Sequence, residues 1–144
     1  MLKGSIMVRF APMTEAEFEP YVQQTIIDYA AEHAKAGNGT PEEALHNAKK
    51  ELHDLLPQGV DTPNQYLFSV LDAETGTKVG LIWFAERRNG SQSSAFIYDI
   101  VINEAFRQQG YGKQTMRMLE TNINELGLGT ISLHVFGHNK TAIA

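Results

Sequence analysis

A strand pattern, a glycine-containing turn and an amphipathic helix pattern follow one another directly in this chain. Residues 95–102 are apolar apart from Asp99, which predicts a buried strand. Residues 112–126 carry apolar side chains at helical spacing and are followed by Gly127, which predicts a helix with a glycine end. A helix that begins straight after such a turn presents several backbone amides at one point, with the positive end of its dipole behind them. The segment between the two elements therefore predicts a binding site for an anion.

The first half of the chain predicts one strand and two helices. Apolar residues alternate with others over residues 6–11, which predicts a strand that ends at Pro12. Thr14 and Thr40 are each followed three residues later by glutamate, the spacing of a capping box, and apolar residues then recur at helical spacing. We expect the first helix to end at the glycines after residue 36 and the second to run through roughly Leu55.

The second half predicts strands, with one further helix between the last two. Residues 66–71, 79–85 and 95–102 are joined by short glycine-containing turns, which predicts three antiparallel strands in a meander. Residues 130–136 predict a fifth strand, which returns beside the third by a helical crossover and therefore runs parallel to it. Residues 139–144 are typical of a helix that has just begun. The order of elements is that of an α+β fold.

Composition bounds the classes of protein to consider. At 144 residues and 42% hydrophobic content, the chain is long enough for one compact domain, which we place at residues 1–144. The 12 basic and 17 acidic residues give a net charge of -5, which predicts no nucleic-acid partner and no attraction to an anionic membrane. No apolar run is long enough to span a bilayer, and the first residues lack the pattern of a signal peptide. We expect a cytoplasmic protein.

Metal and thiol chemistry are not expected either. The chain has no cysteine, so disulfides, thiolate nucleophiles and thiolate metal sites are excluded together. His33, His46 and His53 fall on the two early helices without carboxylates at metal-ligand spacing. We therefore predict no metal cofactor.

The turn after residue 102 fits two common phosphate-binding motifs poorly. A Walker loop requires glycine where Arg107 stands and Ser or Thr where Gln114 stands. A dinucleotide fingerprint requires a small residue in place of Thr115 and an acidic residue on the following strand. A nucleotide-binding site of another kind remains an alternative.

Arg107, Gly110 and Gly112 have the spacing of a different motif. This Arg-x-x-Gly-x-Gly pattern after a strand resembles the acyl-CoA-binding motif of the GNAT acetyltransferase superfamily, although the proline common in the family's lead-in is absent from residues 102–106. Residues 133–144 are similar to the family segment in which a strand ends and an asparagine, here Asn139, opens the next helix. Asn139 also fits an ordinary helix N-cap. The element order extends the resemblance over nearly the whole chain.

The resemblance implies a GNAT fold, in which helices flank a central, mixed and mostly antiparallel sheet, with acetyl-CoA as co-substrate. The strands at residues 100–102 and 133–136 are then parallel but parted, so that their backbone groups hold the pantetheine arm while amides of the following turn hold the pyrophosphate. The cofactor-binding residues implied in this way are Ile100, Val101, Ile102, Arg107, Gln108, Gln109, Gly110, Tyr111, Gly112, Lys113 and Asn139.

The implied chemistry is direct attack by an amine on the thioester, helped by a general base and by donors to the oxyanion. Asp99, beside the expected thioester position, is the first candidate base; an ordinary hydrogen-bonded strand carboxylate explains it equally well. His134 on the partner strand is the second candidate. Tyr98 and Glu86 are further candidates, with core packing and a solvated strand end as the alternatives.

The family pattern continues to a tyrosine about seven residues after Asn139 and then to two more strands, and this chain ends at Ala144. We therefore expect a fold that lacks its last strands, and either a homodimer or exchanged-strand assembly or impaired activity. The function predicted is an N-acetyltransferase acting on an amine of a small molecule, peptide or protein. The alternative is a non-catalytic acyl-CoA-binding module.

Overall fold

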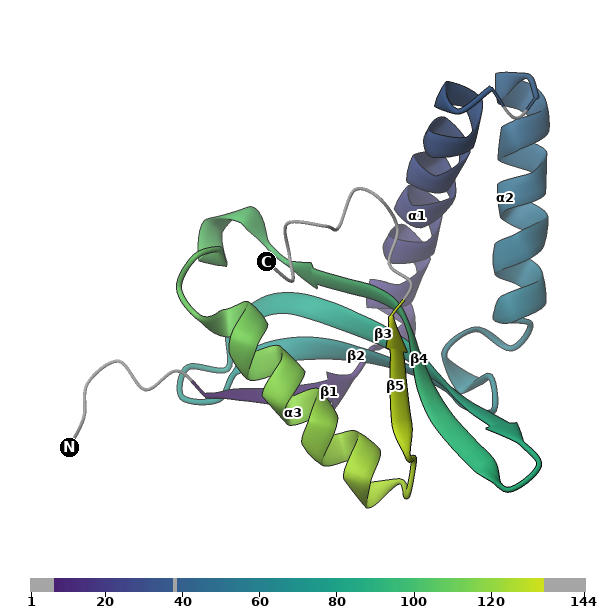
Figure 1. Ribbon diagram of the computed structural model, residues 1–144. Coiled ribbons are helices and arrows are strands. Elements are labelled where there is room, and N and C mark those ends of the chain that lie inside the picture. Colours follow the sequence, from purple (N-terminus) through teal and green to yellow (C-terminus); the bar gives the residue numbers. More distant parts are fainter. Residues whose placement is uncertain (1–6, 38, 134–144) are drawn as a thin grey trace. The chain divides into compact units, whose positions relative to one another are not determined.

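The computed structural model describes residues 7–37 and 39–133 of the chain (Figure 1). The chain divides into two compact units. We call Met13–Gln65 the helical unit, and Met1–Pro12 with Tyr66–Ala144 the sheet unit. The assignment of residues 1–144 to a single domain stays a prediction.

The helical unit contains the two expected helices, with a complete capping box at Thr14 and a side-chain cap at Thr40. Helix α1 spans Glu15–Lys35 and α2 spans Pro41–Leu55, and a 3-10 turn, η1, follows at Gly59–Asp61. The Thr14 hydroxyl accepts from the Glu17 amide at 3.2 Å, and the Glu17 carboxylate accepts from the Thr14 amide at 3.0 Å. The Thr40 hydroxyl accepts from the Glu43 amide at 3.1 Å. Each cap satisfies amides that the helix itself leaves without an acceptor, so both helix starts are confirmed.

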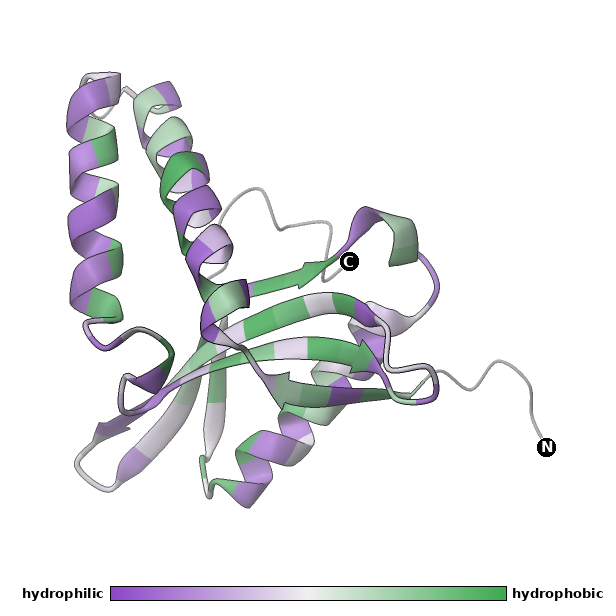
Figure 2. Cartoon of the chain, turned by 180° about the vertical axis from the view of Figure 1, so that it is seen from behind, coloured by the Kyte–Doolittle hydropathy of each residue, from purple (hydrophilic) through white to green (hydrophobic). Residues whose placement is uncertain are grey.

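Helices α1 and α2 lie side by side within the helical unit (Figure 1). Small side chains are buried on both: Ala30 on α1, and Ala44 and Ala48 on α2. Figure 2 shows α2 as mainly hydrophilic with hydrophobic patches, as expected for a helix that buries one stripe and exposes the rest. Small side chains at the buried positions allow the two backbones to approach closely.

Within the described residues, the sheet unit is built on five strands in the order β1-β2-β3-β4-β5. Their bounds are Val8–Pro12 for β1, Gln65–Asp72 for β2, Lys78–Asn89 for β3, Gln92–Ile102 for β4 and Thr130–Leu133 for β5. Strands β1 and β2 pair antiparallel, as do β3 and β4, whereas β4 and β5 pair parallel. The parallel pair follows from the crossover through α3, Tyr111–Glu125, which carries the chain back along the sheet. The α+β fold and its mixed, mostly antiparallel sheet are confirmed.

The hydrophobic core of the sheet unit lies between α3 and one face of the sheet. Leu119 and Ile123 of α3 pack with strand residues that are themselves almost inaccessible. Burial of one such large apolar side chain contributes about 1.5–3 kcal/mol. The strand members of this core with no measurable exposure are Val70, Val79, Ile82, Phe84, Ala95, Ile97 and Ile100. The core therefore fixes α3, and with it the turn that precedes α3, against β4.

The expected elements at the chain ends are described only in part. The predicted fifth strand over residues 130–136 is present as β5 up to Leu133. His134, Asn139 and the predicted helix start at 139–144 lie outside the described residues. Among the described helices, none is both long enough and apolar enough to cross a membrane.

Candidate functional site

The turn between β4 and α3 leaves the first amides of α3 without an acceptor in the helix. After β4 the chain makes one 3-10 turn, η2 (Glu104–Phe106), and enters α3 through Gly110, whose φ is 95° and which makes no side-chain cap hydrogen bond. The Gln114 amide donates to the Gly110 carbonyl at 3.1 Å, closing the first turn. The amides of residues 111–113 precede that bond and point out of the helix end. We call residues 107–113 the α3 corner.

Gln108 adds a second left-handed residue to the α3 corner. Its φ is 61°, a conformation that a residue with a Cβ adopts at a cost of about 1–2 kcal/mol. Two left-handed residues within three positions, Gln108 and Gly110, turn the backbone sharply before the helix starts. Strain of this kind persists where the surrounding structure enforces it, and it concentrates at ligand-binding loops.

Side-chain hydrogen bonds hold the α3 corner to the segment before it. The Arg107 Nε donates to the Ile102 carbonyl at 2.8 Å, and the Gln109 Nε2 donates to the Ala105 carbonyl at 3.0 Å. The first bond ties the corner to the last residue of β4. Arg107, Gln108, Gln109, Gly110 and Lys113 are all exposed, so the outer surface of the corner carries two cations and an open backbone.

Tyr111 fixes the start of α3 from the inside. Its ring is buried and meets the Phe106 ring edge to face, with centroids 5.8 Å apart. Its hydroxyl donates to Asp72 Oδ2 at 2.6 Å, which lowers the pKa of the Asp72 carboxyl and raises that of the Tyr111 phenol. The Tyr111 side chain is therefore an anchor, and only its amide faces the corner. Asp72 was not singled out from the sequence, because its partner lies 39 residues away.

The three predicted cofactor-binding residues on β4 differ in which of their groups a ligand can contact. Ile100 and Ile102 are buried in the core of the sheet unit, so only their backbone groups are available to a ligand. Val101 is half-buried. Gly112 lies in the first turn of α3 and, like its neighbours, contributes an amide.

A bulge interrupts β4 beside these residues. Trp83 of β3 pairs with Asp99 and the next residue, Phe84, pairs with Ile97, so Tyr98 has no partner on β3. A bulged residue leaves the ladder and increases the local twist of the strand, and bulges are common next to active sites. The described part of the ladder between β4 and β5 runs from Ser94 opposite Thr130 to Ile97 opposite Leu133, one residue before the bulge.

Strand β4 continues from Tyr98 to Ile102 beyond the described part of β5. The parting of the strands stays a prediction, because residues 134–136 lie outside the described residues. The bulge itself was not foreseen. Its signal is present in the chain, since the core positions of β4 change from 95 and 97 to 100 and 102, which breaks the period of two.

Asp99, the first candidate base, lies next to the bulge and is only 1% exposed. It is paired with Trp83 across the strands, and Trp83 stacks on Tyr98 with ring centroids 4.5 Å apart. Paired residues of adjacent strands share a face, so these side chains lie on the face of the sheet opposite the core. We call this the second face.

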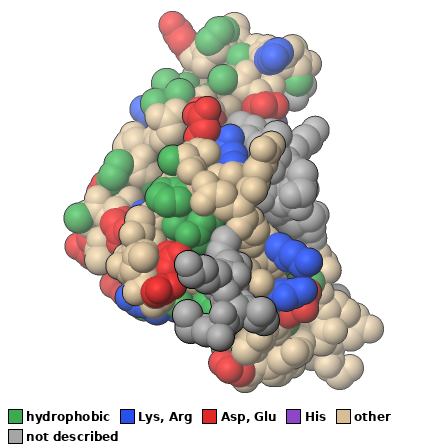
Figure 3. Space-filling view, turned by 90° about the vertical axis from the view of Figure 1, so that its left-hand side faces the viewer, with side chains coloured by type: hydrophobic (Ala, Val, Ile, Leu, Met, Phe, Trp, Pro, Cys, Tyr) green, Lys and Arg blue, Asp and Glu red, His purple; other side chains and the backbone are tan. Residues whose placement is uncertain are grey.

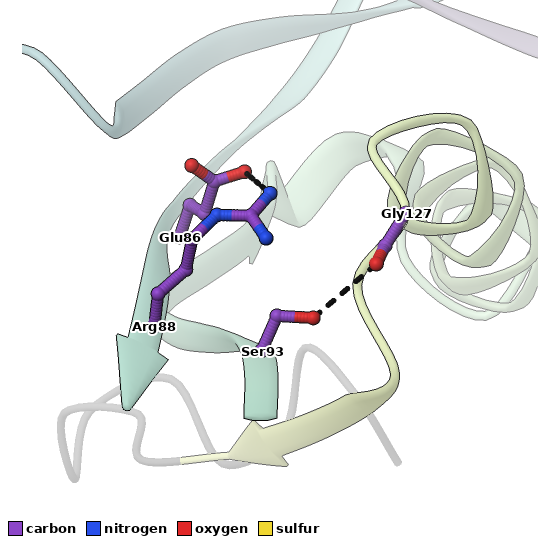
Figure 4. A network of polar contacts seen from close by, with 4 residues as sticks. All are labelled: Glu86, Arg88, Ser93 and Gly127. Carbon is purple, nitrogen blue, oxygen red and sulfur yellow. Dashed lines mark hydrogen bonds and ion pairs between the residues drawn. The ribbon is translucent and has the colours of Figure 1, made fainter. Parts of the chain in front are cut away.

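Glu86, a further candidate, is not brought to Asp99. Two residues after the core residue Phe84 on β3, it lies on the core side of the sheet and forms an ion pair with Arg88 at 3.1 Å (Figure 4). The position of His134, the second candidate base, is not described.

Two negative expectations concern charge and metals. Figure 3 shows acidic and basic side chains interspersed on one face of the molecule, with no continuous basic patch there. Within residues 7–37 and 39–133, no group of three or more His, Asp or Glu side chains is arranged to hold a metal ion.

Comparisons with known proteins assign the chain to one family. The model of the acetyltransferase (GNAT) family matches residues 38–144. The chain is 38% identical over 135 residues to the uncharacterized N-acetyltransferase YycN of Bacillus subtilis (strain 168), covering 94% of this chain and 86% of that protein. It is 31% identical over 131 residues to the uncharacterized N-acetyltransferase YdgE of the same organism, covering 91% and 83%. The chain belongs to the GNAT acetyltransferase family.

Solved structures agree. The crystal structure of YycN matches with a TM-score of 0.81 over 94% of this chain and 86% of that one. An aminoglycoside acetyltransferase from a soil metagenomic sample, meta-AAC0020, matches with a TM-score of 0.55 at 16% identity over 99% of this chain and 86% of that one, which shows a shared fold alone. The family assignment and the GNAT fold predicted from the sequence are confirmed, whereas the site residues and the association of copies stay predictions.

Proposed function

We propose that this protein transfers an acetyl group from acetyl-CoA to a primary amine. The observation that carries the proposal is the α3 corner, where a helix start without a side-chain cap follows the bulged strand β4 after one 3-10 turn. Family membership supports an acyl-CoA as the donor. The corner then binds the pyrophosphate, because outward-pointing amides and the positive end of a helix dipole favour an anion.

In this proposal, the pyrophosphate and the pantetheine arm of acetyl-CoA bind to different segments of the chain. Amides of residues 108–113 receive the pyrophosphate, and the exposed Arg107 and Lys113 add charge at the rim. The backbone of β4 from Tyr98 to Ile102 offers hydrogen bonds to the amides of the pantetheine arm, as a sheet edge does to an added strand. Asn139, which the family resemblance implies as a further contact of the donor, lies outside the described residues. The bound donor thus places its thioester near the bulge.

The reaction is a nucleophilic acyl transfer. The neutral amine attacks the thioester carbonyl carbon, the carbon–nitrogen bond forms, and an oxyanion develops on the carbonyl oxygen. The bulge leaves Tyr98 without a partner residue on β3, and its amide is our candidate donor to that oxyanion. The intermediate collapses with cleavage of the carbon–sulfur bond, and CoA leaves as the thiolate, which takes up a proton.

Asp99 is the group on the second face suited to remove the amine proton, directly or through a water. His134 is the second candidate for this role. The near-complete burial of Asp99 also favours a second function, a non-catalytic acyl-CoA-binding module, because a carboxylate so enclosed needs a route to the amine.

The test is the release of free CoA thiol from acetyl-CoA across a panel of primary amines, with calorimetric binding of CoA, ATP and NAD to the same preparation. We expect tighter binding of CoA than of ATP or NAD, and amine-dependent thiol release. Binding of CoA without release on any amine would establish the binding module instead. Comparable affinity for all three ligands would contradict the acyl-CoA assignment.

A further inference from the structure

Arg87 of β3 is held in a fixed position on the second face of the sheet. Its guanidinium carbon lies 3.8 Å from the centroid of the Phe96 ring, and its Nη2 donates to the Tyr98 hydroxyl at 2.7 Å. Stacking and hydrogen bonding together restrict a side chain that is otherwise exposed. The guanidinium therefore contacts the aromatic side chain of the bulged residue itself.

The surroundings of Arg87 are rich in hydroxyl groups. Arg87 is opposite Ser94 on β4, and Ser94 is opposite Thr130 on β5, while Ser132 follows in the next row beside Phe96. Since paired residues share a face, all three hydroxyls lie on the same side as the guanidinium. A hollow of about 630 Å³ opens here, lined by Arg87, by these three residues and by the adjoining turns.

The two adjacent arginines of β3 differ in their partners, since Arg88 pairs with a carboxylate and Arg87 contacts aromatic side chains. Arg88 lies on the other side of the strand and is paired with Glu86 at 3.1 Å (Figure 4). Arg87 makes no ion pair with a carboxylate in the described part of the chain, although acidic residues outnumber basic ones overall. The hairpin at this place is held to the turn after α3, because the Ser93 hydroxyl donates to the Gly127 carbonyl at 3.2 Å (Figure 4).

The distance from this guanidinium to the proposed reaction centre suits a small molecule. Asp99 pairs with Trp83, and Phe96, under the guanidinium, pairs with Ala85, two residues further along β3. Two strand residues correspond to about 7 Å. A ligand that reaches from the bulge to Arg87 therefore spans roughly the length of an amino acid with an extended side chain.

We propose that the amine acceptor carries a carboxylate several bonds away from its amino group, and that Arg87, aided by the hydroxyls of Ser94, Thr130 and Ser132, binds that carboxylate. A guanidinium matches a carboxylate with two parallel hydrogen bonds, which gives orientation as well as affinity. The inference rests on the proposed function, because the amino group is placed at the thioester. It makes Arg87 a residue that determines acceptor specificity.

The test compares 6-aminohexanoate with 6-aminohexanamide, which differ only in the carboxylate. Binding of each to the CoA-loaded protein is measured by calorimetry, and acetylation of each by thiol release. We expect the wild type to prefer the carboxylate on the order of tenfold, and Arg87→Gln to remove the preference. Arg88→Gln is the matched control, because it removes a cation at the next position on the other face, and it should keep the preference.

The outcomes separate this inference from the proposed function. Preferential binding of 6-aminohexanoate without acetylation of either compound would contradict the proposed activity and leave the specificity of Arg87 supported. Equal binding of both compounds to the wild type would overturn the inference, and that comparison needs no variant. A preference that survives in Arg87→Gln would overturn it as well. Arg87→Lys, which keeps the charge but not the planar fork, should retain only part of the preference.

Discussion

Replacement of Gly110 by alanine tests the α3 corner most sharply, because the same strain can be introduced at the other end of the same helix. Gly110 has φ 95° before α3, and Gly127 has φ 75° after it, with nothing within 4 Å of an added Cβ. An L-residue in the left-handed region costs about 1–2 kcal/mol. Both Gly110→Ala and Gly127→Ala should therefore lose stability by that amount, with a Tm about 3–7 °C lower for a chain of 144 residues.

Only one of the two variants should lose affinity for CoA. Relief of the strain at Gly110 rotates the amides that begin α3, and a lost hydrogen bond to a charged group weakens binding on the order of tenfold or more. The assay is isothermal titration calorimetry with CoA and with pantetheine, which lacks the pyrophosphate. Gly110→Ala should weaken CoA binding and leave pantetheine binding unchanged, while Gly127→Ala changes neither. Equal loss of CoA affinity in both variants would refute the reasoning.

Three further predictions follow from contacts around the site. The Tyr111 hydrogen bond lowers the pKa of the Asp72 carboxyl below its ordinary value of 3.8, so this bond stabilises the folded state above pH 3.8. That stabilisation is lost as the pH falls through the lowered pKa of Asp72. Tyr111→Phe should therefore be less stable than the wild type at neutral pH, and its free energy of unfolding, measured by chemical denaturation, should vary less with pH in this acid range. Gly80→Ala would bring a Cβ to 2.0 Å from the Val101 carbonyl oxygen. The substitution should therefore lower the free energy of unfolding by about 1–3 kcal/mol or more. A Tm equal to that of the wild type would contradict the close approach of β3 and β4 at Gly80. Asp99→Asn should lower kcat about a hundredfold or more without changing the KM for acetyl-CoA, and unchanged kcat would exclude Asp99 as the base.

Local signals in the sequence were sufficient to predict most of the elements. Thr14 and Thr40 predicted the helix starts because a cap is made within one turn of chain. The apolar patterns predicted the strands because their period of two reflects which face is buried. The parallel return of β5 beside β4 followed from the helix that separates them.

Features that depend on distant contacts were not predictable in the same way. The hydrogen bond from Tyr111 to Asp72 joins the start of α3 to the end of β2, and no local sequence pattern near either residue predicts it. The left-handed conformation of Gln108 is imposed by the turn around it, because glutamine itself does not favour that region. From the sequence alone, Arg87 is an ordinary cation on a strand. Only the structure shows that its guanidinium lies over Phe96 and beside the bulged residue Tyr98.

Binding of the acyl donor's pyrophosphate by the amides of the α3 corner can be observed residue by residue. The measurement follows the backbone amide resonances of a ¹⁵N-labelled sample during titration with CoA and, separately, with pantetheine. Residues 108–113 should show the largest shifts with CoA and little change with pantetheine, while residues 98–102 should respond to both. Unmoved corner resonances at saturating CoA would contradict this mode of binding.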